Sequence, residues 1–147
     1  MRCVEAEALV GAPRDEVWEL LDDLEGMPRW MPRVRAVSPS GPAHVGTLYR
    51  VRTSTLGLPG IRDWEIVEHR RPLRQVRVAF DGRLERALVL VLDARGTGTR
   101  LHAEVELRSS LPRPVRLVHE MLATFAAGWS VRSLVHAVKR AFEDAPR

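Results

Sequence analysis

One short run of the sequence, DWEIVEHRR, combines an acid and a guanidinium with large apolar side chains. If the run is a β-strand, alternate side chains project from one face, and one such set is Trp64, Ile66, Glu68 and Arg70. Inside a pocket, the arginine could stabilise negative charge developing on a substrate oxygen and the carboxylate could transfer protons. On the outer face of a sheet, the same pair would be a surface salt bridge of little energetic value. The surrounding elements decide between the two cases.

Length and composition indicate a single domain. The 147 residues, 45% of them hydrophobic, allow one domain over residues 1–147 with a core large enough to surround a pocket. The longest apolar stretch, 87–92, is far shorter than the roughly 20 residues of a membrane span, and the first residues carry acids where a signal peptide has an apolar core. We therefore predict a cytoplasmic protein with no membrane span. The lone cysteine, Cys3, is predicted to be an ordinary strand residue.

The charge pattern argues against nucleic acid as a partner. The net charge is +4 and the pI is about 10.4, but arginines alternate with acids and apolar residues instead of clustering beside aromatic side chains. The five histidines show no metal-ligand spacing, and the sequence contains no phosphate loop, dinucleotide fingerprint or nucleophile elbow. We predict no nucleic-acid partner, no metal site and no cofactor.

Most of the remaining sequence reads as strands joined by short turns. A strand over 4–10 and a helix that begins at Pro13 and stops at Gly26 come first, and residues 27–32 form a short second helix or turn. Six further strands are predicted because apolar runs are separated by turn-forming residues. Short turns imply antiparallel neighbours. The predicted strands are about 34–38, 47–53, 62–70, 75–80, 84–93 and 99–108.

A helix of about 30 residues is predicted from Pro114 to Glu143, since Gly128 is the one internal breaker. Its apolar residues fall on two arcs, one before and one after Gly128, displaced by roughly 100°. Gly128 is therefore a candidate kink. Such a helix could close a pocket with one half and pack against a sheet with the other.

Three segments carry a resemblance to a known superfamily: the opening VGAPRDEVWELLDDLEGMPRWMP, the central WEIVEHRRP and the GTGTRL turn into the last strand. Their order and separation resemble the START-related helix-grip superfamily, also called SRPBCC, and in particular its polyketide cyclase/dehydratase branch. The resemblance implies an α+β helix-grip fold. That fold is a curved seven-stranded antiparallel sheet wrapped around a long C-terminal helix, with two short helices after the first strand.

The resemblance also implies a deep, mostly apolar cavity between the sheet and the helix. Strand parity indicates which side chains face it, because the apolar set of each strand must be the inner one. In DWEIVEHRR the set that contains Trp64 and Ile66 is the more apolar. We therefore expect Glu68 and Arg70 to point into the cavity.

Roles for these residues follow from the same resemblance. In the aromatase/cyclases of aromatic polyketide biosynthesis, which this chain resembles at that strand, an arginine is held to bind and polarise the poly-β-keto substrate. Arg70 matches that arginine, and Glu68 is predicted to be its acid/base partner, where the family carries a hydroxyl residue. The residues predicted to line the ligand site are Trp64, Ile66, Tyr49, Trp30, Met31, Phe80, Leu101, Ala103, Val105, Met121, Phe125 and Trp129.

Two functions are compatible with the sequence. One is a cofactor-independent polyketide cyclase, aromatase or dehydratase-like enzyme that acts on a hydrophobic carbonyl compound. The other is a non-catalytic carrier or sensor of a lipid or other apolar ligand, which needs a dry tunnel but no paired polar groups. A third possibility is a collapsed cavity in a domain that mediates protein contacts. The apolar outer residues Ala87, Val89 and Val91 fit that case or a homodimer.

Overall fold

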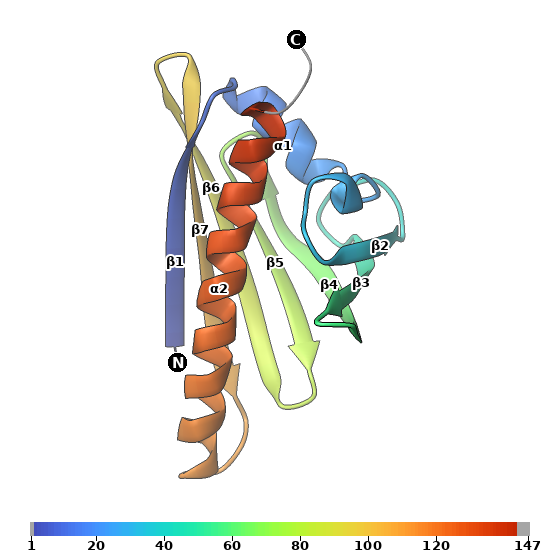
Figure 1. Cartoon of the computed structure of the whole chain (residues 1–147), viewed down its shortest axis with the longest axis vertical. Coiled ribbons are helices and arrows are strands. Elements are labelled where there is room, and N and C mark those ends of the chain that lie inside the picture. The colour runs from blue at the N-terminus through green and yellow to red at the C-terminus, as the bar shows by residue number, and fades with distance from the viewer. Residues whose placement is uncertain (1, 144–147) are drawn as a thin grey trace.

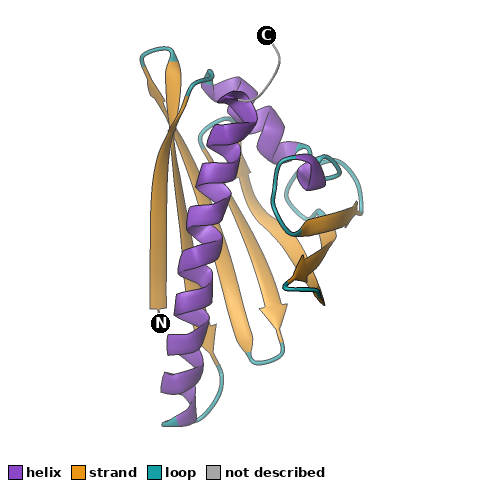
Figure 2. Cartoon of the chain, viewed as in Figure 1, coloured by secondary structure: helices purple, strands orange, loops and turns teal. Residues whose placement is uncertain are grey.

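A computed structural model describes residues 2–143 and has the predicted α+β architecture (Figure 1). Seven antiparallel strands form one sheet in the order β1-β7-β6-β5-β4-β3-β2, and a long helix crosses one face of it (Figure 2). Among the described residues, no helix is both long and apolar enough to cross a membrane. The strands are β1 (Arg2–Val10), β2 (Val34–Pro39), β3 (Leu48–Thr55), β4 (Leu58–Arg70), β5 (Arg74–Asp81), β6 (Leu84–Arg95) and β7 (Gly98–Ser109).

The expectation of two short helices after the first strand is met only in part. A nine-residue helix, α1 (Arg14–Asp22), follows β1, but the next segment is a three-residue 3-10 helix, η1 (Met27–Arg29). Pro32 explains the shortness of η1, because the residue before a proline is disfavoured in the helical region. The connection from η1 to β2 therefore leaves the helical path, and Arg33 has a φ of 70°.

The long helix, α2 (Val115–Glu143), packs on the β1 and β7 end of the sheet. Its buried face is built from small and β-branched side chains, including Ala123, Ala127 and Val131. These lie over the inner side of β7, where Leu101 and Leu107 are fully buried. Small residues allow a close approach of helix and sheet, so the main core lies between α2 and strands β1, β7 and β6.

A second, smaller core lies on the other half of the sheet. It contains Leu24, Tyr49, Val51 and Ile66, with Trp64 packed beside them. These residues come from the α1–η1 connection and from β3 and β4. The concave side of the sheet is therefore filled by α2 at one end and by the α1–η1 segment near the other (Figure 1).

The β3–β4 hairpin turns more tightly than predicted. Leu56 and Gly57 form the turn with φ values of 53° and 79°, the positive values that two-residue hairpins require. Pro59 and Gly60, which we expected in the turn, belong to β4. A Cβ on Gly60 would lie 2.6 Å from Thr53 Oγ1, so a larger residue there would require the Thr53 side chain to move.

Candidate functional site

A β-bulge in β4 decides which side chains face the concave side. Ile66 lies opposite Arg77 of β5, whereas Glu68 lies opposite Val76, so one extra residue is accommodated between them. A bulge of this kind reverses the side on which the following residues point. Ile66 before the bulge is fully buried, and His69 after it packs against the α1 side chain Trp18.

The predicted inward orientation of Glu68 and Arg70 is therefore wrong. Both point to the convex face, where the Glu68 carboxylate accepts a hydrogen bond from Arg74 Nε at 3.2 Å and lies 3.6 Å from Arg70 Nη1. The Arg70 side chain is 66% exposed. Strict alternation misplaced the pair because it allows for no bulge. The pair is the outer-face salt bridge that was the alternative interpretation.

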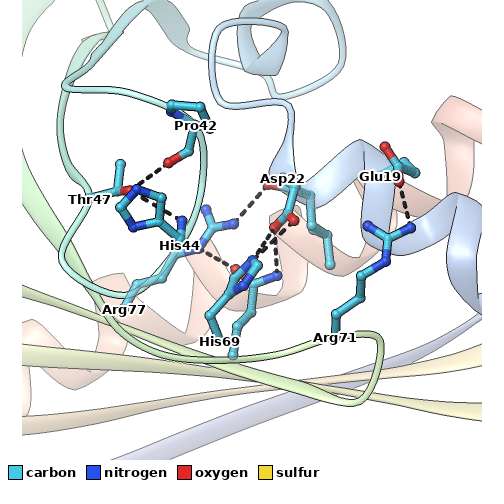
Figure 3. A network of polar contacts seen from close by, with 10 residues as sticks. Glu19, Asp22, Pro42, His44, Thr47, His69, Arg71 and Arg77 are labelled. Carbon is cyan, nitrogen blue, oxygen red and sulfur yellow. Dashed lines mark hydrogen bonds and ion pairs between the residues drawn. The ribbon is translucent and has the colours of Figure 1, made fainter.

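The inward residue at this point of β4 is His69, which meets a carboxylate from α1. His69 Nε2 lies 3.0 Å from both carboxylate oxygens of Asp22, the last residue of that helix (Figure 3). The Trp18 ring lies 5.1 Å from the imidazole, tilted by 56°. Asp22 is thus placed to orient the imidazole.

Arg77 of β5 is the central cation of the concave side and is 3% exposed. Its Nη2 donates to the Leu21 carbonyl at 2.7 Å, its Nη1 to the Tyr49 hydroxyl at 3.2 Å, and its Nε to Gln75 Oε1 at 2.8 Å. The Leu21 carbonyl belongs to the C-terminal end of α1, where a helix carries partial negative charge. Arg77 therefore caps α1 and fixes the Tyr49 hydroxyl.

Gln75 joins the two parts of this arrangement, because its Nε2 lies 3.4 Å from Asp22 Oδ1 while its Oε1 accepts from Arg77. Burial raises the pKa of the Tyr49 hydroxyl, and the nearby Arg77 charge partly offsets that rise. We call this group the inner polar cluster; its members are Asp22, Tyr49, His69, Gln75 and Arg77.

Only part of the inner polar cluster can meet a ligand. Gln75 is fully buried and Tyr49 is 4% exposed, whereas the side chains of His69 and Asp22 retain 14% and 18% exposure. The cluster thus combines a buried scaffold with an accessible imidazole–carboxylate pair, the arrangement that general acid/base chemistry requires.

An open cleft of about 380 Å³ adjoins Asp22. It lies between the α1–η1 connection, 22–25, and the β2–β3 loop, with 39 and 41–43 on its wall. Thr47 shapes that loop, because its hydroxyl donates to the Pro42 carbonyl at 2.6 Å and accepts from the His44 amide at 3.1 Å (Figure 3). On the other side of Asp22, Arg71 donates to Glu19 at 2.6 Å, which ties the β4–β5 turn to α1 (Figure 3).

The remaining β4 and β3 residues predicted for the site do face the concave side. Trp64 is half-buried, and its ring is stacked on Tyr49 with centroids 6.5 Å apart and an interplanar angle of 9°. Ile66 is fully buried in the second core. Trp30 is partly buried against the main core, and Met31, in the connection after η1, is half-buried.

The ligand-lining residues predicted on β5 and β7 do not line an open pocket. Leu101, Ala103 and Val105 point inward as expected, but the packed α2 covers them. Phe80 lies on the convex side of β5, opposite Glu85, and is 68% exposed. Its expected place in the pocket is wrong, because Ala79 occupies the inward position.

The three α2 residues predicted to line the pocket also point away from the sheet. Phe125 lies two residues from both Ala123 and Ala127, a rotation of about 200° around the helix, and is 83% exposed. Met121 and Trp129 are 56% and 50% exposed for the same reason. Their predicted place on the pocket wall is wrong, since the small residues of α2 took the sheet-facing positions.

Two arginines that the sequence reasoning missed lie on the concave side by register. Arg62 pairs with the buried Val51, and Arg86 pairs with the buried Ala79, which itself lies opposite Trp64. Both arginines are half-buried. Strand alternation in β4 and β6 already places both arginines on the inward side. They were not predicted as site residues because an arginine at an inward position interrupts the apolar pattern that identifies the inner face.

A third group lies on the convex face of β1 and β7. The ligand atoms of Glu5, His102 and Glu104 come within 4.8 Å of one another. His102 already pairs with Glu7 at 2.9 Å and with Glu5 at 3.4 Å. These contacts account for the group as a surface ion-pair network. The sequence showed no sign of it because the strands are about 100 residues apart.

Comparison with known proteins identifies the fold. The sequence model of the family described as polyketide cyclase/dehydrase and lipid transport matches residues 1–143. No protein of curated function matches the sequence.

Solved structures share the architecture over nearly the whole chain. The protein TTHA0849 from Thermus thermophilus is 21% identical, with a TM-score of 0.80, covering 99% of this chain and 100% of that chain. A START superfamily protein from Mycobacterium smegmatis is 15% identical, with a TM-score of 0.78 and 97% of each chain covered. The Zhui aromatase/cyclase from Streptomyces sp. R1128 is 18% identical, with a TM-score of 0.73, covering 97% of this chain and 93% of that chain. The predicted START-like fold is confirmed.

Proposed function

Because the chain belongs to the family of polyketide cyclases/dehydrases and lipid-transport proteins, we propose that it binds a hydrophobic small molecule on the concave side of the sheet and acts on it as a cofactor-independent cyclase, aromatase or dehydratase. The ligand lies beside Trp64, and the accessible pair of His69 and Asp22 is the acid/base group. Arg62 and Arg86, which share the concave side with Trp64, bind carbonyl oxygens at the Trp64 end of the ligand.

One observation carries the proposal: an oriented imidazole–carboxylate pair lies on the concave side, 3.0 Å between His69 Nε2 and Asp22. In an aldol cyclisation, neutral His69 takes the α-proton of one carbonyl group, and the enolate carbon then bonds to a second carbonyl carbon. The imidazolium returns the proton to the new alkoxide, so atoms and charge balance. Asp22 holds the imidazole in place for both proton transfers.

The test is turnover of a linear poly-β-ketone thioester mimic, followed by liquid chromatography and mass spectrometry. His69→Gln removes the base, so we expect the rate to fall by about 100-fold or more, with binding of a fluorescent apolar probe retained. Arg70→Ala is the matched control on the opposite face of the same strand, and its turnover and probe binding should equal those of the wild type. Undiminished turnover by a folded His69→Gln variant would rule out His69 as the general base.

A carrier function is the second candidate, favoured by a specific observation. Arg77 and Gln75 form their hydrogen bonds with other protein groups. This part of the cluster can therefore be a structural scaffold that leaves a mainly apolar wall for the ligand. A carrier binds the apolar probe but releases a cyclisable substrate unchanged. Wild-type binding without any turnover would therefore support the carrier over the enzyme.

A further inference from the structure

The outward face of α2 carries a row of large, mostly exposed apolar side chains, and only Trp129 among them has a described cation–π partner, the Arg33 guanidinium 3.7 Å from its ring centre. Val118, Met121, Leu122, Phe125 and Trp129 are between 50% and 83% exposed. They recur at intervals of three or four residues, so they share one side of the helix, opposite the buried Ala123 and Ala127. Exposed apolar rows of this kind mark docking surfaces.

The same side of the helix becomes cationic beyond Trp129. Continuing at intervals of three or four residues gives Arg132, His136 and Arg140, all exposed. Of the two acids in α2, Glu120 is 7% exposed and accepts a hydrogen bond from the Ser109 amide, whereas Glu143 is exposed at the end of the helix, 4.0 Å from Lys139. The outward face is therefore apolar over its first half and mainly cationic over its second, where Glu143 is the one exposed acid of the helix.

We propose that this outward face of α2 docks on a lipid bilayer that contains anionic lipids. Helices that lie in the membrane interface combine apolar side chains such as Trp, Phe and Leu with basic ones, because the former enter the acyl boundary while the latter meet headgroup phosphates. Trp129 lies at the change from apolar to cationic residues, the position that tryptophan favours at an interface. The face is the convex side of a single helix, which a flat, deformable surface can cover.

A second copy of the chain fits the face less well. An antiparallel copy laid along the whole helix would set the cationic half of each chain on the apolar half of the other, and a parallel copy would set the cationic halves on each other. Charge complementarity thus favours an anionic surface. The docking stands apart from the proposed catalytic function, since vesicle binding requires neither His69 nor turnover.

The test is co-sedimentation of the full chain with vesicles of phosphatidylcholine alone or mixed with phosphatidylglycerol. Phe125→Ser, with its side chain 83% exposed, should fold like the wild type by circular dichroism and lose about tenfold in binding to both vesicles. The double variant Arg132→Gln with Arg140→Gln should bind the phosphatidylglycerol-containing vesicles about tenfold less or weaker still, with no change on phosphatidylcholine vesicles. Added salt should weaken binding of the wild type to the anionic vesicles in the same way. The matched control is Leu9→Ser, which alters an exposed leucine of β1 that is not part of this face.

Three outcomes would overturn the proposal. The first is that the wild-type chain stays in the supernatant when anionic vesicles are sedimented. The second is that Phe125→Ser binds these vesicles as well as Leu9→Ser does. The third is a dimer by light scattering that Phe125→Ser dissociates while vesicle binding is absent, which would assign the face to a second copy of the chain.

Discussion

His69 and Arg70 are neighbours in the chain with opposite surroundings. The imidazole faces α1 and is oriented by Asp22, whereas the guanidinium faces solvent with Glu68 as its partner. The Arg77 guanidinium is held by three uncharged acceptors, which are a backbone carbonyl, an amide oxygen and a hydroxyl. These hydrogen bonds offset the cost of burying the Arg77 guanidinium on the concave side.

Cys3 gives a prediction at the same scale. Its thiol donates to Glu104 Oε1 at 2.7 Å, and this hydrogen bond, together with partial burial and nearby acids, raises its pKa from 9.0 to about 11. At pH 8 the thiolate fraction should therefore be about 100-fold below that of an ordinary thiol. Iodoacetamide alkylation should be correspondingly slow and should rise with pH up to about 11.

Glu104→Gln should speed that alkylation by about tenfold at pH 8, because it removes the main cause of the raised pKa. Glu7→Gln, an exposed change in the same strand pair, is the control that should leave the rate unchanged. Since the folded state favours the protonated thiol, the stability that this preference contributes is present below pH 9 and is lost as pH rises toward 11. Equal alkylation rates in Glu104→Gln and the wild type would refute the assignment.

At the scale of elements, α2 is one continuous helix whose packing face is narrow. Its contact with the sheet rests on alanine, valine and glycine, so the large apolar side chains of its first half remain outside. The change of apolar arc at Gly128, which suggested a kink, marks the place where the outward face becomes cationic. Gly128 itself is buried against Val4 of β1.

Gly128→Ala should stabilise the protein. A Cβ at this position would meet the Arg132 side chain at 3.5 Å and Val4 Cγ1 at 4.0 Å, both ordinary contacts. The free energy of unfolding should rise by about 0.5 to 1 kcal/mol, since alanine favours the helix interior over glycine. Urea denaturation measures the change.

Gly98→Ala is the contrasting variant. Its Cβ would lie 2.7 Å from the Val10 carbonyl oxygen, a backbone atom that cannot move aside. We therefore expect a loss of about 1 to 3 kcal/mol. A loss of stability in Gly128→Ala would show instead that the helix needs glycine there for a bend.

At the scale of the whole molecule, two cores share one sheet, and few contacts join the α1–η1 side to α2 directly. Arg33 supplies such a contact: its guanidinium lies 3.7 Å from the centre of the Trp129 ring and donates to Ser133 Oγ at 3.3 Å. The cation–π contact connects the segment before β2 to the middle of the long helix.

Arg33→Ala should loosen the β2 side without affecting the main core. Loss of the cation–π contact should cost about 0.5 to 1 kcal/mol, and amide hydrogen exchange should speed up in η1 and β2 while β6 and β7 stay unchanged. Mass spectrometry of exchanged peptides gives the measurement. Uniform acceleration across all strands would mean that Arg33 supports the global fold and not this one contact.

The sequence was sufficient for the fold because alternation, turn residues and the long helical segment all favour the same architecture. Seven strands and α2 lie close to their predicted bounds. The inner polar cluster could not be predicted from the sequence, since it joins residues of α1, β3, β4 and β5 that are far apart in the chain. Parity identified Trp64 and Ile66 as inward, and failed at Glu68, where pairing with β5 absorbs one extra residue.

The extra residue in β4 moves the inward positions along the sequence by one. Removing one residue between Ile66 and Glu68 would restore regular pairing with β5 and would leave His69 inward and Glu68 and Arg70 outward, because the deletion replaces the bulge. A relative of the same length whose strand has no bulge would instead present residues of the other parity on the same wall. A functional residue transferred between two such chains by ungapped alignment would be assigned to the wrong side of the sheet.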